Sequence, residues 1–122
     1  MKLYDNFFLP ADDLQKGRAF YEEALGLKVK FDLAAQGILA LEVGEEEPAL
    51  FLGTRWKKPA IWFEVDDVQA HYVALREKGV VFLSEPFEVR TGLAVEFEDP
   101  FGNRLGITDY TKMPEHARAK AQ

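Results

Sequence analysis

The sequence predicts an α+β fold built from two β-α-β-β-β repeats, because two pairs of segments match at one spacing. Residues 6–14 (Asn-Phe-Phe-Leu-Pro-Ala-Asp-Asp-Leu) resemble residues 60–68 (Ala-Ile-Trp-Phe-Glu-Val-Asp-Asp-Val). At the same spacing, residues 37–43 resemble residues 91–97. A repeat of this period indicates one supersecondary unit used twice, so it decides the fold before any local pattern does.

Each repeat is expected to begin with a strand that runs directly into a helix. Ile61, Phe63 and Val65 alternate with other residues, and this period of two is typical of a strand with two unlike faces. One residue of the Asp-Asp pair at 66–67 then caps the helix, because a carboxylate accepts hydrogen bonds from the first N–H groups of a helix. The Asp-Asp pair at 12–13 has the same role in the first repeat.

The other elements follow in the same order in both repeats. The first repeat is expected to contain strands at 3–11, 27–32, 38–43 and 49–53 and a helix at 13–25. The second is expected to contain strands at 60–65, 80–83, 93–97 and 104–108 and a helix at 67–78. Gly26 and Gly79 are placed to end the helices in left-handed turns, and the Asp-Pro-Phe-Gly-Asn stretch at 99–103 predicts a turn before the last strand.

Apolar residues at helical spacing predict the buried face of each helix. They are Leu14, Tyr21, Ala24 and Leu25, with Phe20 beside them, and Val68, Tyr72 and Leu75. Two polar stretches between elements are interpreted as solvated connectors: the three glutamates at 45–47, and the segment 54–59 with Arg55, Trp56, Lys57 and Lys58. A cation at the glutamates and an anionic partner for the lysines are the alternatives.

A chain of 122 residues fits one domain, 1–122, with repeat one at 1–55, repeat two at 59–110 and a polar tail at 111–122. Each half is too small to stand alone comfortably, so the halves should share a core. The tail is expected to be either frayed or a short helix that lies on a neighbour.

Composition excludes several classes of function. The absence of cysteine excludes disulfides, thiolate metal sites and a cysteine nucleophile. No apolar run approaches the ~20 residues of a membrane span and no secretion signal is evident, so we expect a cytoplasmic protein without a membrane partner. The net charge of −6 argues against nucleic acid and weakly favours neutral or cationic small ligands.

Several motifs together resemble the vicinal oxygen chelate superfamily of glyoxalases, extradiol dioxygenases, fosfomycin-modifying enzymes and bleomycin resistance proteins. They are the tandem repeats, the Asp-Asp pair before each helix, Phe-Tyr at 20–21 followed by Leu-Gly-Leu at 25–27, and the turn at 99–103. The resemblance covers residues 3–108. It implies curved, mostly antiparallel sheets around a cleft, the glyoxalase/bleomycin-resistance fold, and a homodimer in which repeats pair within a chain or swap between chains.

In catalytic members of that family, His, Glu or Gln side chains from the first and last strands of each half hold a divalent metal. Here the two histidine positions hold Asn6 and Ala60, and the glutamate position of the last strand holds Gly106. The corresponding position of the first half falls at Phe51 or Leu52. Asparagine is a poor ligand and the others are none, so we expect neither a metal site nor another cofactor.

Strand alternation predicts the lining of the cleft. The helix-covered core is expected to hold Phe7, Leu9, Leu39, Leu41, Ile61, Phe63, Val65, Leu93, Val95, Leu105 and Ile107. The opposite parity gives the candidate ligand-binding residues Asn6, Phe8, Glu42, Trp62, Glu64, Glu96 and Arg104, with Ala60, Gly106 and Thr108 between them. The glutamates could instead lie at exposed strand edges, and Trp62 at a dimer interface.

An aromatic and acidic pocket suits a planar or cationic ligand, through stacking, cation–π attraction and paired charges. The first hypothesis is therefore a metal-free protein that binds and sequesters a small molecule. The alternative is a lyase, isomerase or dioxygenase-type enzyme, either with metal held by Glu42, Glu64 and Glu96 or with one of these carboxylates as a general base. No catalytic residue is assigned. A third reading is an interaction module whose cleft is filled by its own side chains.

Overall fold

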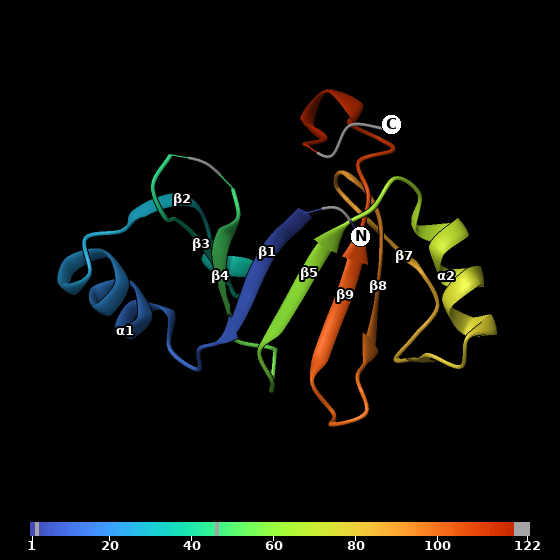
Figure 1. Ribbon diagram of the computed structural model, residues 1–122. Coiled ribbons are helices and arrows are strands. Elements are labelled where there is room, and N and C mark those ends of the chain that lie inside the picture. Colours follow the sequence, from blue (N-terminus) through green and yellow to red (C-terminus); the bar gives the residue numbers. More distant parts are fainter. Residues whose placement is uncertain (2, 46, 119–122) are drawn as a thin grey trace. The chain divides into compact units, whose positions relative to one another are not determined.

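The computed structural model describes residues 1, 3–45 and 47–118, and these residues fold into two units (Figure 1). The first unit is residues 6–60, and the second comprises residues 1–5 together with the chain from residue 61 onward. The structure confirms the α+β class and the predicted repeat order. The organisation as a single domain with its repeat boundaries, and the cleft between repeats, stay predictions.

The first unit forms the sheet order β2-β3-β4-β1. Strand β3 (Ile38–Glu42) pairs antiparallel with β2 (Lys28–Leu33) and with β4 (Ala49–Gly53), and β4 pairs parallel with β1 (Leu3–Pro10). The turn η2 (Ala34–Gln36) joins β2 to β3. The core of this unit holds Leu39, Leu41 and Leu52, with Leu9, Leu14, Tyr21 and Leu50 packed against them.

The helix expected at 13–25 is present but is not one α-helix. Asp13 caps it as predicted, because its carboxylate accepts hydrogen bonds from the backbone N–H groups of Gln15 (3.0 Å) and Lys16 (3.1 Å). The chain is α-helical in α1 (Leu14–Arg18) and then π-helical in η1 (Ala19–Ala24).

The π-helical segment changes which side chains are buried. Its bonds span five residues, as the one from the Leu25 N–H to the Phe20 carbonyl does (3.0 Å), so the wider turn departs from the 3.6-residue spacing. Leu14 and Tyr21 pack on the core as expected. Phe20, Ala24 and Leu25 are exposed, and the prediction that they belong to the buried face was wrong.

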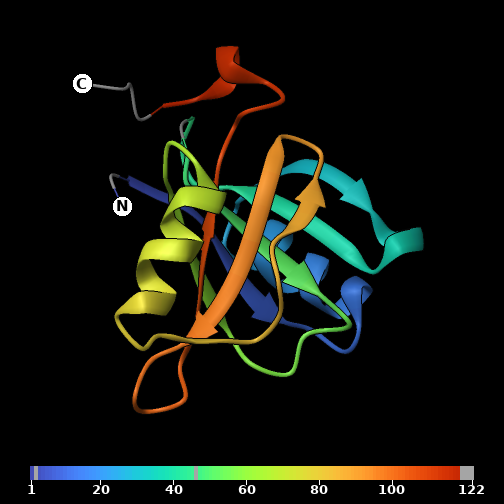
Figure 2. The same ribbon diagram turned by 90° about the vertical axis from the view of Figure 1, so that its right-hand side faces the viewer.

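The second unit forms the order β5-β9-β8-β6, with β7 also paired to β8 (Figure 2). Its strands are β5 (Ala60–Glu64), β6 (Val81–Phe82), β7 (Phe87–Val89), β8 (Gly92–Glu98) and β9 (Arg104–Thr108). Strand β8 is antiparallel to β6, β7 and β9. Strand β7 was not predicted, because its three residues beside Pro86 are too few for an alternating pattern to identify a strand, and it is defined by its pairing with β8.

Helix α2 (Val68–Glu77) covers one face of this sheet. Asp67 caps it through a hydrogen bond from the Ala70 N–H (3.1 Å). Val68, Tyr72 and Leu75 face inward as predicted. The core beneath them also holds Phe63, Val65, Leu93, Val95, Phe97, Leu105 and Ile107. Ile61, which was expected in a core, is exposed.

Two aspartates fix the connections of the second unit. Asp99 shapes the predicted turn, since its carboxylate accepts hydrogen bonds from the Asn103 side chain (2.8 Å) and from the backbone N–H groups of Phe101 and Asn103. These hydrogen bonds hold the pKa of Asp99 below its usual value, and the bond from the Asn103 side chain has the largest effect. Asp109, which is buried, accepts from the Val68 N–H (2.8 Å) and the Leu93 N–H (2.9 Å), so it ties the start of α2 to β8.

Residues 111–118 contain one short 3₁₀ turn, η3 (Pro114–His116), rather than a frayed tail. Residues 119–122 of the predicted tail lie outside the described residues. No helix in the described ranges is long and apolar enough to span a bilayer.

Candidate functional site

Three of the predicted site residues meet on the face of the second unit opposite α2. Oε2 of Glu96 on β8 accepts one hydrogen bond from Nε1 of Trp62 on β5 (2.8 Å) and another from Nε of Arg104 on β9 (2.8 Å). The side chains of Glu96 and Arg104 are 18% and 12% exposed. We call this group, with Phe87 and Gly106, the open face. It shows the alternation that the sequence predicted for these strands.

Phe87 adds a second ring to the open face. Its centroid lies 6.4 Å from that of Trp62 at an interplanar angle of 61°, within the range of edge-to-face aromatic pairs. Phe87 is 39% exposed. Sequence reasoning missed it, because it lies on the unpredicted strand β7 and the alternation of β5, β8 and β9 does not reach it.

Gly106 is required under the Trp62 ring. A Cβ atom at this position would lie 2.5 Å from Cδ1 and 2.6 Å from Nε1 of the indole, closer than real Cβ contacts come. The indole therefore occupies the space into which any side chain at position 106 would project. Together with the Glu96 carboxylate, this contact sets the orientation of Trp62.

The first unit carries an aromatic cluster on the face opposite its core. Phe8, which is buried, lies 5.2 Å from Phe51 and 5.1 Å from Trp56 between ring centroids, and Phe31 lies 5.5 Å from Phe51. Trp56 covers Gly53 as Trp62 covers Gly106, since a Cβ at Gly53 would lie 2.5 Å from the indole. The sequence predicted Phe8 here. It assigned Trp56 to a connector, although a glycine three residues before a tryptophan was a weak signal of this contact.

The residues at the positions where the family resemblance places metal ligands form a poor set of donors for a metal ion. The side-chain oxygen of Asn6 accepts a hydrogen bond from the Ala49 N–H (2.9 Å), and Gly106 lies under the indole. Ala60 is buried and offers no ligand atom. Of the two candidates on β4, Phe51 lies on the face of Phe8 and Leu52 lies in the core. Within the described ranges, no three His, Asp or Glu side chains gather in a way that could hold a metal.

Glu64 is placed apart from the other acids, beneath the C-terminal segment. Its side chain is 2% exposed, and its Oε2 accepts a hydrogen bond from the backbone N–H of Arg118 (3.1 Å). The Arg118 guanidinium donates to the Tyr4 carbonyl (2.5 Å). Nearby, the Tyr110 hydroxyl donates to the buried carboxylate of Asp5 (2.5 Å), and desolvation, followed by the charge of Asp5, raises the pKa of Tyr110. Glu42 is half-buried at the end of β3, where its Cα faces that of Lys28.

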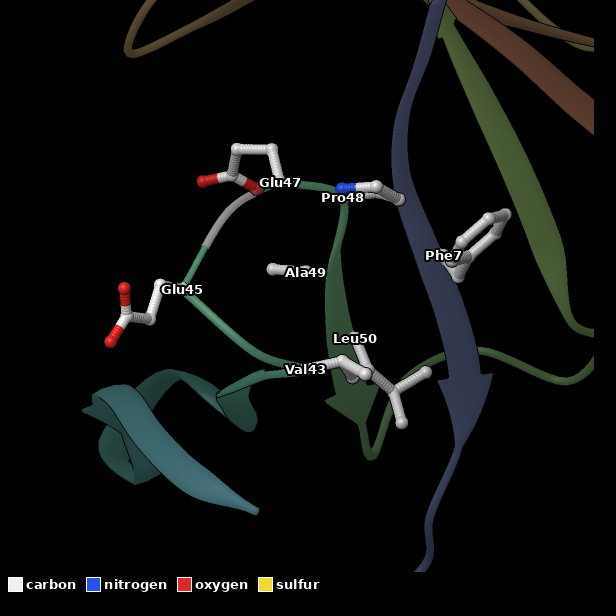
Figure 3. Close-up of a pocket in the computed structure, with 7 residues that line it drawn as sticks. All are labelled: Phe7, Val43, Glu45, Glu47, Pro48, Ala49 and Leu50. Carbon is white, nitrogen blue, oxygen red and sulfur yellow. The ribbon is translucent and has the colours of Figure 1, made fainter.

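A pocket of about 700 Å³ lies elsewhere, at the β3–β4 hairpin of the first unit (Figure 3). It is lined by Phe7, Val43, Glu45, Glu47, Pro48, Ala49 and Leu50. Leu50 also packs on the core beside α1, and Glu47 is paired with Lys30. Figure 3 shows the Glu45 and Glu47 carboxylates at the outer side of the hairpin, away from Phe7. None of the seven predicted ligand-binding residues lines this pocket.

Comparison with known proteins agrees with this architecture. Residues 4–107 match the model of the Glyoxalase/Bleomycin resistance protein/Dioxygenase superfamily. The uncharacterized protein YetH of Bacillus subtilis is 32% identical over 106 residues, which cover 75% of this chain and 85% of YetH. YraH of the same organism is 30% identical over 118 residues, covering 81% of this chain and 91% of YraH.

Solved structures show the same fold at lower identity. A member of the superfamily from Vibrio splendidus superposes with a TM-score of 0.68 at 14% identity, covering 89% of this chain and 99% of that one. A methylmalonyl-CoA epimerase of Streptomyces coelicolor superposes with a TM-score of 0.69 at 20% identity, covering 91% and 99%. The chain belongs to the glyoxalase/bleomycin resistance protein/dioxygenase superfamily.

Proposed function

We propose that this chain binds a small aromatic or cationic molecule on the open face, without the divalent metal of catalytic family members. The observation that carries the proposal is the Glu96 carboxylate, which holds the Trp62 indole and the Arg104 guanidinium at 2.8 Å each. Two strands and a carboxylate thus orient one half-buried ring.

An oriented ring suits ligand binding, because less side-chain freedom is lost when a ligand stacks on it. Trp62 is held by a hydrogen bond at its edge and by Gly106 beneath it, and Phe87, which is 39% exposed, stands beside it. Aromatic surface of this kind attracts planar ligands by stacking and cations by cation–π interaction.

Charge supports a cationic component of the ligand. The chain has a net charge of −6, and such a field raises the local concentration of cations. The charge of Glu96 is already paired with that of Arg104. The aromatic surface is therefore expected to supply most of the contact with the ligand, and the negative net charge of the protein to favour cationic over anionic ligands.

A binding role without metal agrees with the replaced ligand positions. Asn6 is engaged by the β4 backbone, and Gly106 is covered by the indole. The superfamily includes bleomycin resistance proteins, for which the resemblance implies sequestration, and this role needs shape and complementary charge rather than a reacting centre.

The test uses the two tryptophans of the chain, Trp56 and Trp62. In a Trp56→Phe variant, Trp62 is the sole indole reporter. Titration with metal-free bleomycin and with benzyltrimethylammonium should change its emission saturably, and benzyl alcohol should act more weakly. Calorimetry should show affinity lower by about tenfold in Phe87→Ala, the loss of one stacking contact of about 1.4 kcal/mol.

Phe101→Ala is the matched control, because Phe101 is an aromatic residue of the same unit that is 87% exposed in the turn after β8. It should bind like the parent protein. The absence of a saturable response to every probe would refute the proposal, and so would equal losses in the two alanine variants.

The competing function is a metal-dependent lyase, isomerase or dioxygenase-type enzyme. Elemental analysis of protein purified without chelator distinguishes the two functions. We expect less than about one tenth of an equivalent of Zn, Ni, Mn or Fe, since the residues at the family's ligand positions are not donors of the kind these ions prefer. A stoichiometric ion would favour the enzyme.

A further inference from the structure

A second pocket, of about 400 Å³, lies in the first unit beside the connector 54–59. It is lined by residues of the turn η2 and the start of β3, namely Ala35, Gln36, Gly37 and Ile38, and by Gly53, Arg55 and Trp56. Its volume lies within the range of roughly 300–1,000 Å³ that is usual for small-molecule sites. Neither the open face nor any predicted ligand-binding residue contributes to its lining.

Close contacts fix the walls of this pocket. The Trp56 ring lies directly over Gly53, where a Cβ would meet it at 2.5 to 2.7 Å, and packs edge-on against Phe8 with 5.1 Å between centroids. Gly37, which also lines the pocket, adopts a left-handed conformation (φ 78°), and its carbonyl accepts a hydrogen bond from the Thr54 N–H (2.9 Å). These contacts hold Trp56 and Gly37 in place in the lining of the pocket.

The charge of the pocket is opposite to that of the whole chain. Arg55 lines it, and the connector 54–59 also carries Lys57 and Lys58 but no acidic residue. Gln36, a residue with a side-chain amide, also lines the pocket. The lining therefore includes the indole of Trp56, on which a flat ring could stack, and two residues with N–H donors for an anion, Arg55 and Gln36.

We propose that this pocket binds a planar aromatic carboxylate. The ring would lie against Trp56, and the carboxylate would pair with Arg55, whose planar fork of N–H donors matches the two oxygens of a carboxylate. This site goes beyond the proposed function, because it lies in the other unit and selects the opposite ligand charge. It also gives a role to the connector that composition alone assigned to solubility.

The test makes Trp56 the reporter. In a Trp62→Phe variant, benzoate should change the Trp56 emission saturably, whereas benzamide and benzamidine, which keep the ring but not the negative charge, should bind at least about tenfold more weakly. Arg55→Gln in the same background should lower benzoate affinity by about tenfold, the loss of one charge-assisted pair. Lys57→Gln is the matched control, since it removes an equal charge two residues away and should change affinity less than about twofold.

Equal losses in the two glutamine variants would overturn the proposal in favour of general attraction to a basic connector, and so would equal binding of benzoate and benzamide. Because Arg55 is exposed, its substitution should leave the fold intact, which circular dichroism checks. As a second measurement, benzoate should shift the backbone amide resonances of Gly37 and Gly53 in the parent protein, and shifts confined to other residues would contradict the site. If benzoate does not bind at the Trp56 pocket, the Trp62 titrations with cationic ligands are unaffected, so the two proposals are tested separately.

Discussion

The two units hold a tryptophan over a glycine in different ways. In the first unit, Trp56 covers Gly53 and packs edge-on against Phe8, so neighbouring rings position it. In the second unit, Trp62 covers Gly106, and its N–H group is bound by the Glu96 carboxylate. Trp56 packs within a cluster of rings, whereas the N–H edge of Trp62 lies beside a carboxylate, and this edge contact suits Trp62 to present a defined face to a ligand.

This difference arises from residues that occupy matching places in the repeats. Glu42 and Glu96 end the segments Leu-Ala-Leu-Glu and Leu-Ala-Val-Glu. The Cα of Glu42 faces Lys28 across the β2–β3 pair, whereas the Cα of Glu96 faces Gly106 across the β8–β9 pair. A glycine opposite the carboxylate makes room for an indole to reach it. The first repeat also holds Phe8 at the place that matches Trp62, and a phenylalanine ring has no N–H group to donate to a carboxylate.

Removing the central ring of the packed cluster should have the largest effect. Phe8→Ala is expected to lower the free energy of unfolding by about 3–4 kcal/mol, because Phe8 is 6% exposed and its loss leaves a cavity among aromatic rings. Phe87→Ala on the open face, where the ring is already 39% exposed, should cost about 1 kcal/mol or less. Urea denaturation measures both. Similar losses would show that the two faces are held in the same way.

Removing the charge of the central carboxylate tests the polar contact. Glu96→Gln is expected to lower the free energy of unfolding by about 2 kcal/mol, because the Trp62 and Arg104 donors lose a charged acceptor. Glu42→Gln, the matching change in the first repeat, should stay within about 0.5 kcal/mol. In the Trp56→Phe background, Glu96→Gln should also shift the Trp62 emission. An unchanged emission would mean that the carboxylate does not set the ring's surroundings.

Adding one methyl group beneath each indole sharpens the comparison further. Gly53→Ala and Gly106→Ala should each lower the free energy of unfolding by about 1–2 kcal/mol, because the new Cβ would lie 2.5 Å from a ring. Gly106→Ala should in addition weaken binding of benzyltrimethylammonium, since it displaces Trp62, whereas Gly53→Ala should weaken binding of benzoate. Each variant should keep its affinity for the other ligand, so measuring both ligands with both variants provides a control for each site. If Gly106→Ala weakened only benzoate binding and Gly53→Ala weakened only benzyltrimethylammonium binding, the two ligands would have been assigned to the wrong sites.

The smallest effect concerns pH and is specific to the second unit. The pKa of Tyr110 is raised above its ordinary value of 10.0, chiefly by desolvation. A raised folded-state pKa stabilises the protein below pH 10, and this stabilisation is lost as pH rises beyond that point toward the folded-state pKa. The free energy of unfolding should therefore fall more steeply between about pH 9.5 and 11 in the parent protein than in Tyr110→Phe. If the free energy of unfolding fell equally steeply with pH in both proteins, the raised pKa of Tyr110 would be contradicted.

Local patterns predicted much of the fold because their causes are local. Asp13 and Asp67 cap helices through N–H groups two or three residues away, and Asp99 closes its turn within four residues. Strand alternation placed Trp62 and Glu96 on one face, since side chains of a strand alternate whatever the surroundings. Conversely, the π-helical segment was missed because its five-residue hydrogen bonds depart from the 3.6-residue spacing, and β7 was missed because three residues are too few to show a period.

The site residues that sequence reasoning missed make contacts with residues far away in the sequence. Phe87 meets Trp62 across 25 positions only when β7 pairs with β8, and Asp109 binds Val68 N–H from the far end of the unit. Glu64 was expected in a cleft because alternation along β5 indicates the face of the strand to which its side chain points. Alternation does not show that Arg118 covers this side chain. Trp56 was assigned to a connector because nothing in its neighbours along the chain points to Phe8.

By itself, the sequence determined the repeat, the order of most elements and the faces of most main strands, and it predicted Asn6, Ala60 and Gly106 at the family's metal-ligand positions. These follow from side-chain type and spacing, which act over a few residues. Only the tertiary structure decided that an indole lies on Gly106 and is bound by Glu96, and that Trp56 walls a pocket with Arg55. Such contacts depend on how strands and turns pack in three dimensions, and packing is a property of the whole fold rather than of any segment.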